Sequence, residues 1–181
     1  ILDASVDAIA AGIPVLGVNL GKLGYLAELD PAHPDQLDRL FSGDYAVKEE
    51  MLLSVSILRE GRELPSPRYA VNEVFASHDS AIGLATVKLF TSSGESVSYR
   101  ADGLIFATPI GSTAYSLSAG GPIVAHSVPS ITVTPVCPHS FFNRAIVFSP
   151  GETLTLSADE VPLGLSVDGR AVDTLDPGET C

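Results

Sequence analysis

From residue 47 onward, the sequence is a series of short runs rich in β-branched, aliphatic and aromatic residues, and this pattern constrains the fold most. Turn-forming segments such as Glu60-Gly61-Arg62 separate the runs, which is typical of strands joined by tight turns. A hairpin turn is predicted at Val167-Asp168-Gly169-Arg170, because Asp-Gly suits the positive backbone angles of two-residue hairpins. Short connections join antiparallel strands, so residues 44–181 are predicted to form a mainly antiparallel, β-sandwich-like domain. We expect strands over 47–58, 69–77, 84–91, 97–101, 104–108, 131–136, 145–148, 153–157 and 163–167.

The first 43 residues have a different pattern, which predicts the tail of an N-terminal α/β domain over 1–43. Apolar residues recur at helical spacing over 1–11, and Gly12 is a typical helix end. The run 13–18 is short, apolar and rich in β-branched residues, as in a buried parallel strand. A glycine-rich loop and a short amphipathic helix are expected to follow, over 19–25 and 34–41.

Both ends of the sequence favour further polypeptide. The first helix begins at Ile1, with no Ser, Thr, Asp or Asn ahead of it to cap its N-terminus. The segment Asp176-Pro177-Gly178-Glu179 is a turn signal that we expect to lead into another strand, yet Cys181 is the last residue. We therefore expect these 181 residues to be the middle of a longer protein.

The charge balance excludes several classes of partner. Ten Lys and Arg residues against 22 Asp and Glu residues give a formal net charge of −12. Nucleic acids and anionic membranes are bound by basic surfaces, so neither is expected as a partner. No apolar run approaches the roughly 20 residues that cross a bilayer, and no signal-peptide pattern is present. The two cysteines are too few for a disulfide framework or a zinc site, so a cytoplasmic protein is expected.

Residues 103–151 are almost free of charge, since Arg144 is the only charged residue among them. Within this stretch, residues 111–122 are dense in Gly, Ser and Thr, which let backbone N–H groups approach an anion closely. Ser112 or Thr113 is expected to cap a helix whose N-terminus favours negative charge. The alternative is a buried core segment that excludes charge for ordinary reasons. Because Gly, Ser and Thr fill a core poorly, the composition favours a ligand site.

Five blocks of the sequence resemble, in order, the motifs of NAD kinases. The longest runs from Asp102 through Gly111-Ser112-Thr113-Ala114-Tyr115-Ser116-Leu117-Ser118 to Ile123. The other blocks are 14–26, Asn72-Glu73, Cys137-Pro138-His139-Ser140 and Ser166-Val167-Asp168-Gly169. The resemblance implies an N-terminal α/β domain and a C-terminal β-sandwich-like domain, with the dinucleotide bound between them.

The same resemblance implies an activity. NAD kinases transfer a phosphoryl group from ATP, or from polyphosphate in some members, to the 2′-hydroxyl of the adenosine ribose of NAD, which gives NADP. A divalent metal, usually Mg²⁺, accompanies the phosphate donor. Members are typically cytoplasmic homodimers or homotetramers, so NAD, ATP and further copies of the chain are the implied partners.

Matching the family's motifs residue by residue implies a set of NAD-binding residues. They are Asn72, Glu73, Arg100, Asp102, Thr113, Ala114, Tyr115, Ser116, Leu117, Ser118 and Arg170. An Asn amide donates and accepts hydrogen bonds and a Glu carboxylate accepts them, which suits ribose hydroxyls. Adjacent strand residues point to opposite faces, so Asn72 and Glu73 reach one ligand only at a strand end or a bulge. No chemistry is assigned to Cys137 or His139, which we expect in a packed loop.

Two departures from the family pattern bear on activity. Ile110 stands where the family usually has Thr, which removes a hydrogen bond worth about 1 kcal/mol. The Gly-Gly-Asp-Gly-Thr motif, whose Asp is the family's proposed general base, is absent from the 181 residues and is expected just before Ile1. No other carboxylate has a motif for that role, so we assign no catalytic residue and no metal ligand. We predict that this chain alone is not a competent kinase.

Two alternative functions stay open. One is a non-catalytic module that binds NAD or mediates subunit contacts without performing chemistry. The other is a lipid kinase of the diacylglycerol type, since these enzymes share the distant architecture. The Ser-Thr-Ala-Tyr-Ser-Leu-Ser run and the Asn72-Glu73 pair favour a dinucleotide over a lipid as the acceptor.

Overall fold

The chain folds into two compact units, residues 1–49 and 50–181. Much of the loop expected at 19–25 and the first residue of the helix expected at 34–41 lie outside the described part of the chain. A computed structural model describes residues 2–20, 26–33, 35–64, 68–78 and 84–181.

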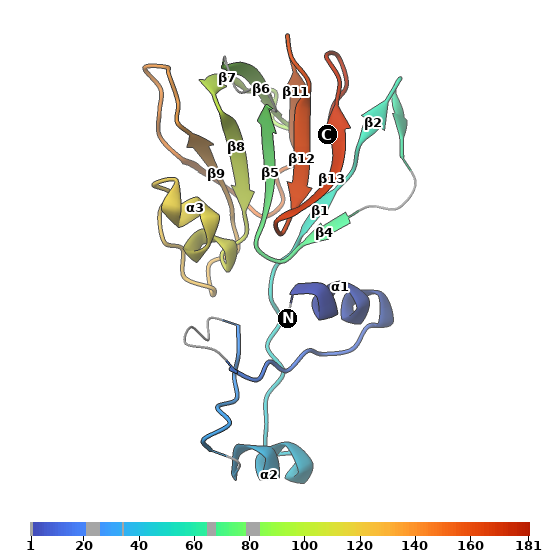
Figure 1. The fold of residues 1–181 in the computed structure, drawn as a ribbon, viewed down its shortest axis with the longest axis vertical. Coiled ribbons are helices and arrows are strands. Elements are labelled where there is room, and N and C mark those ends of the chain that lie inside the picture. Colours follow the sequence, from blue (N-terminus) through green and yellow to red (C-terminus); the bar gives the residue numbers. More distant parts are fainter. Residues whose placement is uncertain (1, 21–25, 34, 65–67, 79–83) are drawn as a thin grey trace. The chain divides into compact units, whose positions relative to one another are not determined.

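The first helix of the N-terminal unit, α1 (Leu2–Ala11), lies where the sequence predicts it (Figure 1). It ends because Gly12 adopts a φ of 66°, a conformation that glycine takes without steric penalty. The N–H of Gly12 donates to the carbonyl of Ile9 at 3.2 Å, and the N–H of Ile13 donates to the carbonyl of Ala8 at 3.1 Å. These two bonds satisfy the last carbonyls in a Schellman ending, which confirms the predicted stop.

The second helix, α2 (Asp35–Ser42), is short and amphipathic, as predicted. Asp35 and Asp38 lie in its first turn and Arg39 in its last, an arrangement that complements the helix dipole. Nε of Arg39 pairs at 2.9 Å with Oδ2 of Asp44, which lies beyond the end of the helix. Both side chains of this pair are largely exposed, so water screens it and it contributes little stability.

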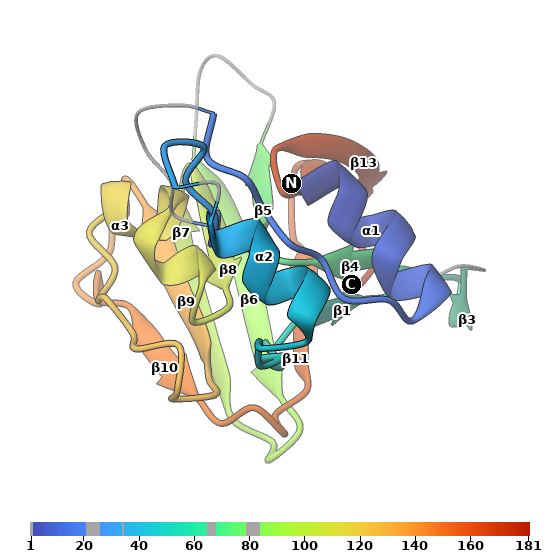
Figure 2. The ribbon, with the colours of Figure 1, turned by 90° about the horizontal axis from the view of Figure 1, so that it is seen from below.

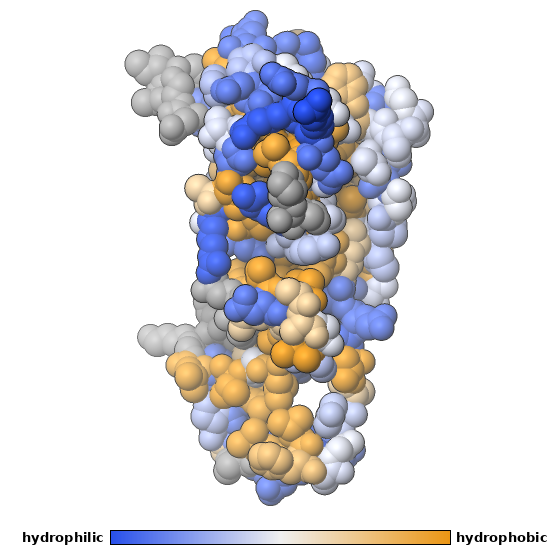
Figure 3. All heavy atoms as spheres, turned by 90° about the vertical axis from the view of Figure 1, so that its right-hand side faces the viewer, coloured by the Kyte–Doolittle hydropathy of each residue, from blue (hydrophilic) through white to orange (hydrophobic). Residues whose placement is uncertain are grey.

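The buried parallel strand predicted over 13–18 is wrong. In the described part of this unit, the segment makes one isolated parallel bridge, between Val18 and Leu29. Ile13 is 61% exposed and Val15 is 43% exposed, and hydrophobic residues do lie on the surface of the chain (Figure 3). A parallel strand is stable when strands pair with it and helices cover its faces. The described residues of 1–49 contain no further strand to provide that pairing.

The C-terminal unit is built from antiparallel sheets, which confirms the predicted fold class (Figure 1). The six-stranded sheet has the order β10-β9-β8-β5-β12-β13, and the three-stranded sheet has the order β11-β6-β7. The strands of the larger sheet are β5 (Glu73–His78), β8 (Gly103–Ala107), β9 (Ile131–Val136), β10 (Ile146–Phe148), β12 (Leu163–Val167) and β13 (Arg170–Leu175). The smaller sheet contains β6 (Ala85–Thr91), β7 (Ser96–Ala101) and β11 (Leu154–Ala158). Two further pairs join β1 (Leu53–Val55) to β4 (Arg68–Ala70) and β2 (Leu58–Arg59) to β3 (Arg62–Glu63).

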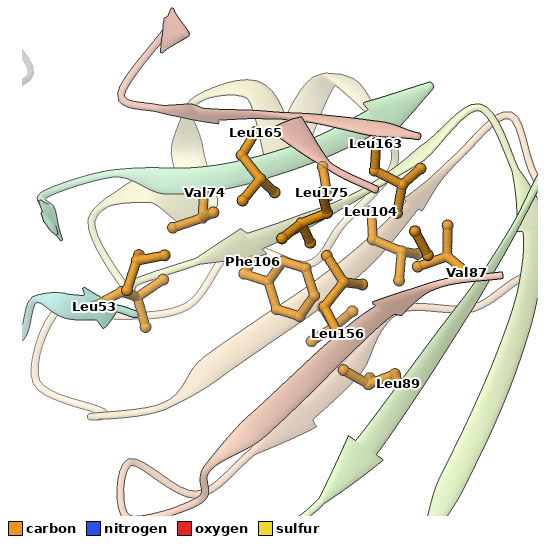
Figure 4. Packing of buried hydrophobic residues seen from close by; sticks show 14 of the residues in the cluster. Leu53, Val74, Val87, Leu89, Leu104, Phe106, Leu156, Leu163, Leu165 and Leu175 are labelled. Carbon is orange, nitrogen blue, oxygen red and sulfur yellow. The ribbon is translucent and has the colours of Figure 1, made fainter. Parts of the chain in front are cut away.

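The hydrophobic core lies between these two sheets (Figure 4). Buried and partly exposed positions alternate along most of β6, as in a strand that turns one face to the core. Leu104 and Phe106 of β8 share one cluster with Val87 and Leu89 of β6 and Leu156 of β11. Burying one such side chain contributes roughly 1.5–3 kcal/mol, so this cluster is a main source of stability.

Every residue of the central strand β8 is buried. One face of the strand belongs to the core, and a short helical segment lies beside the other face (Figure 2). This segment consists of the 3₁₀ turn η1 (Gly111–Thr113) and the short helix α3 (Tyr115–Ser118). Because the chain passes from β8 into η1 within a few residues, η1 and α3 begin at one end of the sheet.

Two of the predicted strands are interrupted in the structure. In the strand predicted over 47–58, residues 47–52 form no ladder, because β4 offers pairing partners only to Leu53–Val55. The strand predicted over 69–77 is broken at Val71 and Asn72, between β4 and β5. The predicted hairpin at 167–170 is confirmed, with Asp168 and Gly169 both at positive φ. No described helix is both long enough and apolar enough to span a bilayer.

Candidate functional site

Asn72 and Glu73 lie at the break between β4 and β5, which is a strand end. Adjacent residues within a strand point to opposite faces, so two neighbours can contact one ligand only at such a position. A side chain from another turn holds the break. Oδ2 of Asp168 accepts the N–H of Val71 at 2.9 Å, and Oδ1 accepts the N–H groups of Asn72 at 2.8 Å and Glu73 at 3.1 Å. In return, the N–H of Asp168 donates to the carbonyl of Glu73 at 3.0 Å. The backbone donors that a broken ladder leaves unpaired are thereby satisfied.

The loop after β8 holds the same break from the other side. The N–H of Thr108 donates to the carbonyl of Asn72 at 2.9 Å, and its hydroxyl donates to the carbonyl of Val71 at 2.6 Å. The hydroxyl also accepts the N–H of Gly111 at 3.0 Å. A Cβ on Gly111 would lie 1.9 Å from the carbonyl oxygen of Asn72, so only glycine fits here. Antiparallel pairing of β5 with β8 and β12 brings these three segments to one end of the sheet.

Glu73 is a buried acid, with 9% of its surface exposed. Burial, and then the charge of Asp168, raise the pKa of the Glu73 carboxyl to about 7, although a hydrogen bond from the backbone N–H of Tyr115 opposes this shift. Among the described residues, no partner hydrogen-bonds to its Oε2 atom. Buried polar atoms are normally paired, so an unpaired carboxyl oxygen beside a strand break is the chemical feature that marks this site.

The side chains of α3 differ in what they offer a ligand. Tyr115 is 42% exposed, and its ring meets the Phe75 ring edge-on, with centroids 5.2 Å apart. Leu117 and Ser118 are exposed as well. Ser116 is fully buried, and its hydroxyl shares a 2.9 Å hydrogen bond with the hydroxyl of Thr134 on β9. The exposed side of this helix is therefore the part that is accessible to a ligand, and Ser116 anchors the helix to the sheet.

The expected helix cap is wrong. The residue before α3 is Ala114, and no side chain caps the helix. The hydroxyl of Ser112 donates to the carbonyl of Pro109 at 2.6 Å, and that of Thr113 donates to the carbonyl of Ile110 at 3.0 Å. Ser and Thr hydroxyls commonly take a carbonyl three residues earlier, and in η1 this local bond replaces the cap. Thr113 and Ala114 are both half-buried.

Six backbone N–H groups of this segment already have acceptors within the chain, so these six are not available to an anion. Their acceptors are carbonyls within the segment or just before it, and each bond is 2.9–3.3 Å long. The donors are the N–H groups of Ser112, Thr113, Ala114, Ala119, Gly120 and Gly121. Short helical turns satisfy their own backbone, so the small residues serve tight turns and close packing here.

A separate cavity of about 430 Å³ lies on the core side of the sheets, lined by residues such as Leu53, Val55, Leu154, Leu156 and Cys181. Its walls are mainly apolar, whereas a dinucleotide carries ribose hydroxyls and phosphates. The polar groups that suit those hydroxyls lie at the strand break, and we place the candidate site there.

Comparison with known proteins identifies the family of this fold and this site. Residues 71–180 match the ATP-NAD kinase C-terminal domain, and residues 1–45 match the ATP-NAD kinase N-terminal domain. The chain belongs to the NAD kinase family. The NAD kinase of Geobacter sulfurreducens is 44% identical over 162 residues, and that of Symbiobacterium thermophilum is 42% identical over 173 residues. The matches cover 87% and 93% of this chain but 56% and 60% of those enzymes.

Solved structures of NAD kinases have the same fold. Yeast NADH kinase complexed with NADH superimposes with a TM-score of 0.85 at 31% identity, over 93% of this chain and 50% of that one. The NAD kinase from Archaeoglobus fulgidus in complex with ATP gives a TM-score of 0.72 at 27% identity, over 92% of this chain and 63% of that one. These likenesses confirm an N-terminal α/β part followed by antiparallel sheets.

The NAD kinase motifs do not all meet at the strand break. The register pairs Glu73 with Ala107 and Ser77 with Gly103, so Asp102, one residue beyond Gly103, lies five residues along the sheet, roughly 17 Å away. There Oδ1 of Asp102 faces Nε2 of His78 at 3.7 Å.

Arg100 also lies away from the break, exposed on β7. Its carbonyl accepts the N–H of His139 at 2.7 Å. The packed loop expected around Cys137 and His139 is wrong, since both residues are exposed. Both side chains therefore face solvent in the loop that follows β9. Arg170, by contrast, begins β13 beside the Asp168 turn and is exposed at the end of the sheet that holds Glu73.

The residue that sequence reasoning missed is Asp168. Its Asp-Gly dipeptide predicts a hairpin turn. Because Asp is typical of such a turn, no further role was assigned to this residue. The remaining signal was its place in the fifth NAD kinase block, Ser166-Val167-Asp168-Gly169. Among the described residues, no group of three or more His, Cys, Asp or Glu side chains is arranged to hold a metal ion, so we derive no step through a metal.

Proposed function

We propose that this chain supplies the NAD-binding part of an NAD kinase, which transfers the terminal phosphoryl group of ATP to the 2′-hydroxyl of the adenosine ribose of NAD. Membership of the family supports the reaction, and a neighbouring structure that binds ATP supports that donor. The unpaired Oε2 of Glu73 at the strand break is the observation that carries the proposal. The chain spans 56–60% of the two enzymes compared above, so the reaction belongs to the whole protein.

In this proposal, the strand break binds a ribose of NAD. The Asn72 amide donates to one oxygen and accepts from another, and Glu73 accepts a ribose O–H at Oε2. The exposed ring of Tyr115, held edge-on by Phe75, forms a wall beside the sugar. Arg170, at the same end of the sheet, is the basic side chain proposed to meet the phosphates. Asp102 and Arg100, at the other end, stay predicted contacts.

This chain orients the acceptor but lacks the residues that complete the reaction. Phosphoryl transfer depends on positioning and on neutralising charge, and a bound Mg²⁺ with the phosphate donor supplies that neutralisation. The Gly-Gly-Asp-Gly-Thr motif is not present in the 181 residues. We therefore propose that the chain binds NAD without converting it to NADP. The homo-oligomer and the cytoplasmic location implied by the family stay predictions.

Calorimetric titration of the chain with NAD tests the proposal, with Glu73→Gln as the variant. At about pH 8 the Glu73 carboxyl is mostly ionised, and the substitution keeps the shape of the side chain while removing its charge. A neutral hydrogen bond of about 1 kcal/mol then replaces a charged one of about 1.5–3 kcal/mol, so we expect roughly tenfold weaker binding. Glu152→Gln is the matched control, because Glu152 pairs with Ser92 on the surface and is expected to leave binding unchanged. No binding of NAD by the unaltered chain, or equal binding by the Glu73 variant, would contradict the proposed site.

A coupled assay for NADP on the same sample tests the second half of the proposal. We expect no NADP from the chain with ATP and Mg²⁺. Diacylglycerol offered in place of NAD separates the lipid-kinase alternative, and we expect neither binding nor phosphorylation of it. Formation of NADP by these 181 residues would show that another carboxylate serves as the base.

A further inference from the structure

Asp168 hydrogen-bonds to the backbone of the candidate ligand residues. Its carboxylate accepts three consecutive N–H groups, at 2.8–3.1 Å, and these belong to Val71, Asn72 and Glu73. A carboxylate that accepts several backbone N–H groups makes charge-assisted bonds, which are stronger than neutral ones. The residues that it holds include both members of the pair that the proposed function places on the ribose.

The backbone of Asp168 adds to this hold. The residue has a φ of 47° in the hairpin between β12 and β13, a region that side-chain-bearing residues seldom adopt. This conformation lets its N–H reach the carbonyl of Glu73 at 3.0 Å while its side chain turns back to the N–H groups. The hairpin is therefore bonded to the strand break in both directions.

We propose that Asp168 is a positioning residue, which fixes the Asn72–Glu73 pair in the orientation that binds the ribose. This role rests on the proposed function, because it acts through residues that the proposed function assigns. Without the carboxylate, the break loses the acceptor that replaces its missing ladder, and the segment is free to extend from β4 into β5. A continuous strand would send the two side chains to opposite faces of the sheet, and one ligand would no longer meet both.

The negative charge of Asp168 indicates that the residue does more than fill space beside the strand break. Asp168 is acidic and lies beside an acid, and its charge contributes to the raised pKa of Glu73. A neutral residue would avoid that repulsion, yet it would not accept three N–H groups equally well. The arrangement therefore retains the backbone bonds despite the repulsion between the two acids.

The test is NAD affinity, measured by calorimetry on the 181-residue chain with Asp168→Ala and Asp168→Asn. Residues that hold metal ligands in place typically change metal affinity by about 10- to 100-fold, and we expect a loss of NAD affinity in the same range for the alanine variant. The asparagine variant keeps one acceptor oxygen, enough for the N–H groups of Asn72 and Glu73, so we expect partial rescue. Asp159→Ala is the matched control, because Asp159 pairs with Lys88 on the surface and is expected to bind NAD normally.

A double-mutant cycle distinguishes positioning from a loss of folding. Asn72→Ala removes the amide but keeps the N–H that Asp168 holds. If Asp168 acts through this pair, Asp168→Ala costs much less affinity in an Asn72→Ala/Glu73→Gln background than in the unaltered chain. A general structural defect would instead lower affinity by the same factor in both backgrounds, and that result would overturn the proposal.

Amide hydrogen exchange supplies a measurement that needs no ligand. We expect faster exchange at residues 71–73 in Asp168→Ala, with the core of β8 unchanged. If the alanine variant does not fold, Asp168→Asn is compared in its place and is expected to expose the N–H of Val71 first. Normal NAD binding and normal protection at 71–73 in the variant would overturn the positioning role alone. Absence of NAD binding by the unaltered chain would overturn the proposed function and the positioning role together.

Discussion

At the scale of single residues, the site depends on an acid kept in an environment that disfavours its charge. Glu73 is buried beside a second acid, and both burial and that acid raise its pKa, although a hydrogen bond from the backbone N–H of Tyr115 opposes the rise. Such a group is unfavourable for folding once it ionises, and groups of this kind often mark functional sites. The ionisation of Glu73 should therefore change how the free energy of unfolding depends on pH.

The pKa of Glu73 is about 7 in the folded chain, whereas the unfolded chain has the ordinary value near 4.5. Between these values the folded state binds more protons than the unfolded state, so the free energy of unfolding falls as pH rises from 4.5 to 7. Denaturant titrations across this range should show a smaller fall for Glu73→Gln than for the unaltered chain. Identical pH profiles for the two proteins would show that the acid is solvated in solution.

At the scale of elements, the sheet register decides which loops meet. β5 is antiparallel to both β8 and β12, so its first residue lies beside the last residues of those two strands. The turns that follow β8 and β12 therefore converge on the break before β5. Close backbone approach at this junction depends on Gly111, against which the carbonyl of Asn72 packs.

Replacing Gly111 by Ala tests this junction. The added Cβ would lie 1.9 Å from a backbone oxygen, so the loop or the break must shift. Overpacking of this kind typically costs about 1–3 kcal/mol, and we expect a lower Tm together with weaker NAD binding. Gly151→Ala is the control, because its Cβ would have no neighbour within 4 Å. Equal Tm and equal NAD affinity in the two variants would mean that the junction has room for a Cβ beside the carbonyl of Asn72.

At the scale of the whole molecule, the proposed binding of an anionic dinucleotide would have to overcome a net charge of −12. The small residues of 111–121 do not resolve this conflict, since many of their N–H groups donate internally. Recognition in our proposal therefore rests on the ribose, through neutral and acidic groups, and on few basic side chains. A site with few basic side chains predicts that NAD affinity does not fall when the salt concentration rises.

Raising the ionic strength from about 0.01 M to about 0.15 M shortens the screening length from about 30 Å to about 8 Å, which weakens the repulsion of NAD by distant acids. We expect NAD affinity to stay level or rise over this range in calorimetric titrations. A site built on a basic cluster would show the opposite trend. A clear fall in affinity with salt would therefore contradict a ribose-centred site.

Much of the fold could be predicted from the local pattern of the sequence. Strand runs, Asp-Gly turns and the Gly12 helix stop are local features, because alternation and turn chemistry act over a few residues. The strands at 131–136 and 163–167 lie where they were predicted. The strand predicted at 13–18 failed because an apolar run becomes a strand only when a partner pairs with it, and pairing is not local.

The sequence by itself determined the family, the antiparallel architecture and the candidate pair Asn72-Glu73, because these depend on motifs and short-range patterns. Only the tertiary structure decided that Asp168, about a hundred residues away in the sequence, hydrogen-bonds to the backbone of that pair. It also decided that Ser116 faces inward to Thr134, and that Asp102 lies at the far end of the sheet. The physical reason is that hydrogen-bond partners and burial are set by strand register, which joins residues distant in the chain.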